Sequence, residues 1–289
     1  MSDGPNLHAF TIQDTGGTTR TIARGIELVR EMLPQANAVS RQPVPASHLR
    51  IGLQCGGSDG YSGISANPVL GAAVDLLVQH GGTAILSETP EIYGAEHLLT
   101  RRAQTPDIGR KLVERIRWWE EYCARNGASM DNNPSSGNKA GGLTTVLEKS
   151  LGGIAKAGST NLVEVYQYAE PVRARGLVFM DTPGYDPCRP PARWLAARTS
   201  SALPPAAVRP TAARPRLVQA GHQYGAMAAA GRRHGPELRR RAGRTSSIAE
   251  LGEVLLGRLL ETASGKPSRS ELHGYGQQEF VPWQISVIT

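Results

Sequence analysis

The chain has 289 residues, enough for one large domain or two ordinary domains with an apolar core. No apolar run approaches the roughly eighteen residues of a membrane span, the first residues lack the pattern of a signal peptide, and three scattered cysteines exclude a disulfide framework. We therefore expect a cytoplasmic protein with reduced thiols and no membrane partner.

The first predicted element is an amphipathic helix over residues 19–33. Its apolar residues recur at helical spacing, and we expect it to end before Pro34. It begins abruptly and is followed by a connector. Residues 1–48 therefore read as a connector or as the remnant of a preceding domain.

The segment 49–87 has the order strand, glycine-bearing loop, helix, strand. The predicted strands are 49–54 and 83–87, with a helix over 68–80 that Gly81 and Gly82 end. A parallel βαβ unit places the loops after both strands at the carboxyl edge of the sheet, where open α/β sheets bind ligands.

Four further elements complete the predicted fold. They are helices over 106–126, 142–154 and 247–263 and a third strand over 177–180. Together they predict an α/β fold, a Rossmann-like parallel sheet flanked by helices. The expected domains are a core over 49–187 and a carboxy-terminal helix and tail over 245–289.

Between these two parts, residues 188–244 have an unusual composition. Alanine, arginine and proline fill 33 of the 57 positions, which cannot build an ordinary core. Twelve Arg against the single acid Glu237 give this window +11, and the twenty basic and twenty-four acidic residues elsewhere give −4. The charge that would favour a nucleic-acid partner is thus confined to one window, and the remainder is typical of a metabolic enzyme.

Back-translation separates two explanations of this window. Regrouping codons compatible with residues 188–215 by one base permits a string containing CFTTGRGSAYGCAP, and the opposite shift over 220–239 permits ATNTALWQRQEEDMDLNCG. A basic linker has no reason to conceal a globular pattern. We therefore predict a reading-frame error that leaves an irregular or disordered segment. A basic nucleic-acid-binding protein, or a non-catalytic subunit, is the alternative.

The loop that follows the first predicted strand offers a thiol and several backbone N–H groups. Cys55 can bind a metal, and Gly56, Gly57, Ser58 and Asp59 can hold a substrate anion. The alternative is a small buried cysteine in a tight turn.

The loop that follows the second strand carries acids and an imidazole. Glu88 and Glu91 are candidate metal ligands, and His97 is a candidate catalytic residue; the alternative is surface acids beside a helix.

A third polar stretch, residues 131–142, contains Asn138, Lys139, Gly141 and Gly142. If a helix begins at Gly142, N–H groups near its start can bind a carboxylate. Lys139 can bind that carboxylate or act as a base. A plain capping loop is equally consistent with the sequence.

Four long strings closely resemble the altronate and galactarate dehydratases: GLQCGGSDGYSG (52–63), GGTAILSETPEIYGAEHLLTRRA (81–103), NNPSSGNKAGGLTTVLEKSLGG (132–153) and FMDTPGYDP (179–187). The resemblance implies dehydration of a sugar acid to a 2-keto-3-deoxy acid, assisted by a divalent metal, commonly Fe²⁺ (Mn²⁺ and Mg²⁺ being alternatives). The large subunits of sulfolactate sulfo-lyases share the pattern, so the leaving group stays open.

The same resemblance implies a piece of a longer protein, because family members usually carry further amino-terminal portions. We therefore expect this chain alone to have little or no activity. A homo-oligomer or a separate amino-terminal partner is the expected assembly.

Overall fold

The computed structural model describes residues 7–38, 40–55, 58–130, 134–184, 247–267 and 272. The chain divides into two compact units, of which the first contains the described residues up to Pro43 and the second contains the described residues from Val44 on. The predicted out-of-frame segment, residues 188–244, lies outside the described residues. The described part contains no helix that is both long and apolar enough to cross a membrane.

The described part of the first unit contains two helices, α1 (Ile12–Thr15) and α2 (Thr18–Asn37). The helix predicted over 19–33 is confirmed, but its expected end before Pro34 is wrong. Pro34 lies inside α2, near its end. A proline there removes one backbone donor, and only about one further turn of helix follows.

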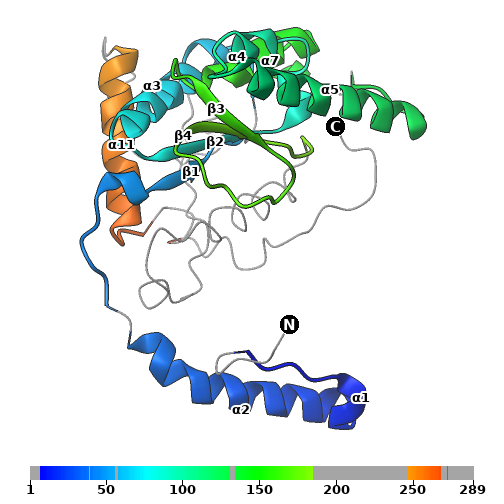
Figure 1. Cartoon of the computed structure of the whole chain (residues 1–289), viewed down its shortest axis with the longest axis vertical. Helices are drawn as coiled ribbons and strands as arrows, with labels where there is room; N and C mark the ends of the chain where they lie inside the picture. Colours follow the sequence, from blue (N-terminus) through cyan, green and yellow to red (C-terminus); the bar gives the residue numbers. More distant parts are fainter. Residues whose placement is uncertain are drawn as a thin grey trace. The chain divides into compact units, whose positions relative to one another are not determined.

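The second unit is built on a parallel sheet in the order β1-β2-β4-β3 (Figure 1). Its strands are β1 (Arg50–Gly52), β2 (Thr83–Ser87), β3 (Leu162–Tyr166) and β4 (Gly176–Met180). The parallel pairing of β1 with β2 confirms the predicted βαβ unit. The α/β fold is confirmed as well, although the sequence did not predict β3.

The helices of this unit are α3 (Ala66–Gln79), α4 (His97–Thr100), α5 (Pro106–Arg125), α6 (Ser136–Ala140), α7 (Val146–Ala155) and α11 (Ile248–Ala263). Among the described residues, three short 3₁₀ turns accompany them: η1 (Ala46–His48), η2 (Ser62–Ile64) and η3 (Thr89–Ile92). The helix predicted over 142–154 begins instead at Val146, because the Thr145 hydroxyl accepts from the Glu148 N–H and caps it there.

The core is divided between the two faces of the sheet. Leu86 and Phe179 belong to the larger cluster, which side chains of α3, α4, α5 and α7 complete, and these helices lie together on one side of the sheet (Figure 1). Ile85 and Val178 point to the other face and pack with Val172 from the segment between β3 and β4. The two central strands are buried along their whole length. They therefore hold the loops at their carboxyl ends on a rigid support.

Helix α11 packs against α3, so residues far apart in sequence share one cluster (Figure 1). Leu255 and Leu256 of α11 lie with Val69, Ala73 and Leu77 of α3. Ser247 caps α11 in a reciprocal pair with Glu250. The helix predicted over 247–263 is therefore confirmed, and it packs on α3.

Candidate functional site at the carboxyl edge of the sheet

The segments leaving β1 and β2 meet through Cys55 and Glu88. The Cys55 N–H lies within hydrogen-bond distance of both Glu88 carboxylate oxygens, at 3.1 Å from Oε1 and 3.2 Å from Oε2. Glu88 is fully buried and has a φ of 77°, a left-handed conformation unusual for a residue with a side chain. Its N–H donates to the Thr182 hydroxyl, which follows β4. The ends of three strands are thereby joined at one point.

Two buried lysines pair with acids of the segment that follows β2, residues 88–97, which we call the β2 loop. Lys149 lies in α7, and Lys156 lies at the carboxyl end of that helix. The Lys156 Nζ lies 3.3 Å from Glu88 Oε2 and 3.4 Å from Glu91 Oε2, and the Lys149 Nζ lies 3.1 Å from Glu91 Oε1. All four residues are less than a tenth exposed. Two carboxylates and two ammonium groups balance in charge, which is what allows such groups to be buried together.

Asn138 connects this network to the segment that follows β1, which contains Cys55 and Ser58 and which we call the β1 loop. Its side-chain oxygen accepts from the Lys149 Nζ at 3.1 Å, and its side-chain nitrogen donates to the Ser58 carbonyl at 2.8 Å. The Ser58 hydroxyl lies 2.8 Å from the Cys55 Sγ. The polar contacts therefore form a closed circuit. It runs from the Cys55 N–H through the two glutamates, the two lysines and Asn138 to Ser58, whose hydroxyl lies against the Cys55 thiol.

The β1 loop and the end of α6 touch through their backbones. The Gly60 N–H donates to the Gly141 carbonyl at 3.0 Å, and a Cβ added to Gly141 would lie 2.9 Å from the Cβ of Asp59. Gly142 has a φ of 98°, which favours glycine. This contact requires glycine because no side chain fits between the two segments.

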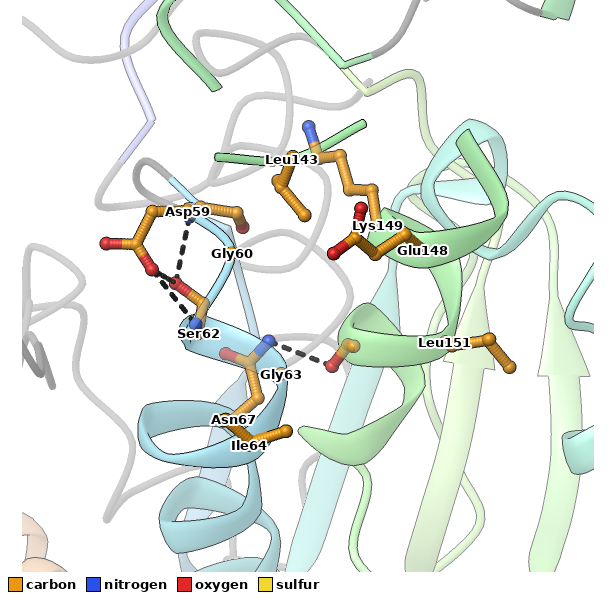
Figure 2. Close-up of a pocket in the computed structure, with 12 residues that line it drawn as sticks. Asp59, Gly60, Ser62, Gly63, Ile64, Asn67, Leu143, Glu148, Lys149 and Leu151 are labelled. Atoms are coloured by element: carbon orange, nitrogen blue, oxygen red, sulfur yellow. Dashed lines mark hydrogen bonds between the residues drawn. The ribbon is translucent and has the colours of Figure 1, made fainter. Parts of the chain in front are cut away.

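A cavity of about 260 Å³ lies between this loop and α7. Figure 2 shows the loop and the start of α3 on one side and Glu148, Lys149 and Leu151 of α7 on the other. The Asn67 side chain joins the two sides by donating to the Gly152 carbonyl at 2.8 Å. Its volume lies just below the range of roughly 300–1,000 Å³ that is usual for ligand sites.

Two acids on the cavity wall are held by local hydrogen bonds. The Asp59 carboxylate accepts from the Tyr61 and Ser62 N–H groups and from the Ser62 hydroxyl. The Glu148 carboxylate accepts from the N–H and hydroxyl of Thr144, which lower its pKa. Both acids therefore stabilise the local backbone.

Asp181 extends the polar cluster on the β4 side. Its Oδ1 accepts from the Thr89 hydroxyl at 2.6 Å and from the Trp119 indole N–H at 2.7 Å, and its Oδ2 lies 4.0 Å from Arg115. Burial raises the pKa of Asp181, and these three neighbours oppose that rise. Trp119 is fully buried, as expected for a core residue, and it also holds this carboxyl group.

The structure brings together five of the residues that the sequence singled out. These are Cys55, Ser58, Glu88, Glu91 and Asn138, all members of the circuit, and Asp59 lies on the cavity wall. Gly56 and Gly57 lie outside the described residues. The roles proposed for all of these residues stay predictions.

The two predicted catalytic residues are placed differently. His97 begins α4 and Lys139 lies in α6, and both are exposed. Lys139 is the neighbour of Asn138 in sequence, but it is Lys149 that donates to the Asn138 side chain. The structure therefore does not bring these two side chains into the buried network.

The expectation that a helix begins at Gly142 was wrong. The Gly141 N–H donates to the Gly137 carbonyl and the Gly142 N–H to the Lys139 carbonyl, so both groups end α6. Because these donors are used within the chain, they do not form the helix-start carboxylate site that the sequence suggested.

The predicted metal ligands Cys55, Glu88 and Glu91 do not form a metal site by themselves. Within the described ranges no group of three or more His, Cys, Asp or Glu side chains is arranged to hold a metal ion. Both glutamates pair with lysines, whose positive charges oppose a second cation at the same place. The described residues thus do not fit the divalent metal that the resemblance implied.

Sequence reasoning missed Lys149 and Lys156. They are seven residues apart, a spacing that puts two residues on the same face of a helix. Ser150, Gly153 and Ile154 of the same segment are buried, so a lysine among small and apolar residues was the available signal.

Comparison with known proteins places these features in a family. Residues 46–196 match the family described as D-galactarate/altronate dehydratase, C-terminal. The chain is 39% identical to the altronate dehydratase of Bacillus subtilis (strain 168) over 181 residues, which cover 63% of this chain and 36% of that protein.

Two further relatives show the range of names in this group. The galactarate dehydratase (L-threo-forming) of Escherichia coli (strain K12) is 43% identical over 161 residues, covering 56% of this chain and 31% of that protein. The (2R)-sulfolactate sulfo-lyase subunit beta of Chromohalobacter salexigens is 35% identical over 182 residues, covering 62% of this chain and 46% of that protein. The matched region thus spans about a third of the length of the dehydratases. Since the family match covers more than half of its residues, the chain belongs to the D-galactarate/altronate dehydratase, C-terminal family.

Proposed function

We propose that this chain carries part of the active site of a hydro-lyase that converts an altronate- or galactarate-type sugar acid to a 2-keto-3-deoxy acid. The observation that supports this most is the buried circuit from Cys55 to Ser58, which fixes both ends of a glycine-bearing loop beside the cavity. Family membership supports the reaction class, because the relatives include altronate and galactarate dehydratases.

The chemistry of such a dehydration sets what the site must supply. A base takes the proton from the carbon next to the carboxylate, the C–O bond at the following carbon breaks, and the hydroxyl leaves as water after gaining a proton. The resulting enol becomes the keto acid. Negative charge accumulates on the carboxylate in the transition state, so cations and N–H donors around it lower the barrier.

A second candidate reaction differs in the leaving group. The similarity to a (2R)-sulfolactate sulfo-lyase subunit supports an elimination that breaks a C–S bond and releases sulfite. The first step, proton removal next to a carboxylate, is the same in both reactions. Sulfolactate therefore belongs among the ligands to be tested.

The proposal also covers the assembly of the chain, its cellular location and the metal it would use. A separate amino-terminal partner would supply what the relatives carry beyond the matched third, and a homo-oligomer is the alternative assembly. A cytoplasmic location fits the buried thiols of Cys55 and Cys123. A divalent metal, Fe²⁺ first, would need ligands besides those described. Metal content measured on protein purified without chelators tests that requirement.

Turnover tests the reaction directly. The purified chain is incubated under reducing conditions with ferrous, manganous or magnesium ions and with galactarate, altronate or sulfolactate, and 2-keto acid and sulfite are measured. We expect a sugar acid to raise the melting temperature of the chain while little or no product forms. The absence of any effect of these acids on melting and product would contradict the proposed function.

A further inference from the structure

We propose that Lys149 binds the carboxylate of the substrate and that Lys156 is a positioning residue that keeps Lys149 in place. This inference rests on the proposed function and specifies which side chain meets the acid. Neither lysine was among the candidate residues that the sequence suggested.

Lys149 is the member of the buried circuit that also forms part of the cavity wall. Its Nζ lies 3.1 Å from Glu91 Oε1 and 3.1 Å from Asn138 Oδ1, which fixes the ammonium group from two directions. Its side chain is 7% exposed, and it lines the cavity together with Gly60 and Leu143 (Figure 2). A salt-bridged ammonium group fixed beside a cavity is suited to hold a carboxylate.

Lys156 has the same charge but does not line the cavity. Its Nζ bridges Glu88 Oε2 and Glu91 Oε2, and its side chain is 4% exposed. Without Lys156, two buried carboxylates would face the single charge of Lys149 and draw that ammonium group toward them. Lys156 thus acts on the ligand through Glu91 and Lys149.

Acids also lie near the cavity, and each has partners within the chain. Asp59 and Glu148 also line it, but backbone N–H groups and hydroxyls already bind both carboxylates. Glu91 faces Lys149 from η3, and Glu88 is bound by the Cys55 N–H and Lys156. Lys149 is the cation among the described residues that line the cavity, and it lies there beside two hydrogen-bonded carboxylates.

A matched pair of ligands isolates the carboxylate. Galactarate and galactitol share a six-carbon polyol skeleton, and only galactarate carries carboxylates. Calorimetric titration of the full chain should show binding of galactarate and not of galactitol. Lys149→Met should weaken galactarate binding by about tenfold to a hundredfold, the usual worth of a hydrogen bond to a charged group, and Lys149→Arg should restore part of it.

Charge-balanced variants test the positioning role. Lys156→Met alone should weaken galactarate binding and lower the melting temperature. Adding Glu88→Gln removes one negative charge and keeps an oxygen acceptor for the Cys55 N–H, so the double variant should recover both properties in part. Failure of the double variant to recover binding, in a protein with an unchanged circular dichroism spectrum, would overturn the positioning role.

The outcomes separate the two proposals. If the unaltered chain binds galactarate and Lys149→Met binds it equally well, the carboxylate assignment is wrong while the proposed function stands. If the unaltered chain binds neither galactarate nor altronate, the proposed function fails and this inference fails with it.

Discussion

The Cys55 N–H and the Glu88 carboxylate form the contact that joins the segments after β1 and β2, at 3.1 Å and 3.2 Å. Glu88 is fully buried and also pairs with Lys156. Glu88→Ala should therefore lower the free energy of unfolding by about 3–5 kcal/mol, because Lys156 keeps its charge with one partner fewer.

Glu88→Gln provides the comparison for this prediction. The amide oxygen can still accept from the Cys55 N–H, so the loss should be smaller than for alanine. Urea denaturation of both variants measures the difference. Equal losses for the two variants would show that the hydrogen bond to Cys55 contributes little.

The raised pKa of Asp181 predicts that the free energy of unfolding depends on pH. Burial raises its pKa above the ordinary value of 3.8, against hydrogen bonds from Thr89 and Trp119 and the charge of Arg115. The folded chain therefore holds this proton to higher pH than the unfolded chain. The stabilising contribution is complete below pH 3.8 and is lost as pH rises through the raised pKa.

Asp181→Asn removes this titration while keeping the acceptor for Thr89 and Trp119. The unfolding free energy of the unaltered chain minus that of the variant should fall as pH rises from about 4 to about 7. Chemical denaturation across that interval measures it. A difference that is constant, or that grows with pH, would show that burial does not dominate at Asp181.

Gly71 and Gly257 form a matched pair for helix packing. A Cβ on Gly71 in α3 would overlap the Ala155 carbonyl and lie 2.9 Å from the Gly158 nitrogen, whereas nothing lies within 4 Å of one on Gly257 in α11. Gly71→Ala should cost about 1–3 kcal/mol of stability. Gly257→Ala should be neutral or stabilise by up to about 1 kcal/mol.

Thermal unfolding of both alanine variants checks this pair. A Gly71→Ala variant as stable as the unaltered chain would mean that α3 and α7 separate without cost, which would weaken the description of the cavity wall. The Gly257→Ala variant is the control, because it measures the effect of replacing glycine by alanine in a helix without a steric clash.

Sequencing the gene tests the predicted reading-frame error. The gene sequence across codons 185–247, compared with the genes of neighbouring strains, should show three single-base length differences of the same sense, near codon 187, codons 215–219 and codon 241. Genes of equal length would favour a true basic linker. In that case DNA binding that falls with salt and is lost on deleting residues 188–244 would support the nucleic-acid-binding alternative.

Local sequence patterns predicted the elements whose own residues decide their structure. The strand Thr83–Ser87 was predicted with its observed bounds, because a continuous apolar run between glycine and polar residues is typical of a buried parallel strand. Strand β3 was missed because Glu164 interrupts its apolar run, and its carboxylate pairs with Lys111 from α5. That partner lies far away in sequence, so no local pattern reports it.

The candidate site follows the same rule. Cys55 and Glu88 could be predicted because each follows a strand, and parallel strands bring their carboxyl ends to one edge. Lys149 and Lys156 were missed because a lysine in a helix usually faces water, and the acids that pair with them lie far away in sequence. Gly141 and Gly142 were misread because the short helix α6 ends there.

The location of the bound acid tests the central claim most directly. Amide resonances of the isotope-labelled chain are followed by NMR during titration with galactarate. The account predicts shifts concentrated at residues 58–64 and 143–152, around the cavity that contains Lys149. The described residues also form another cavity of about 330 Å³, lined by Lys111, Arg115 and Glu170 among others. Shifts confined to that cavity would contradict the account, as would no shift at all.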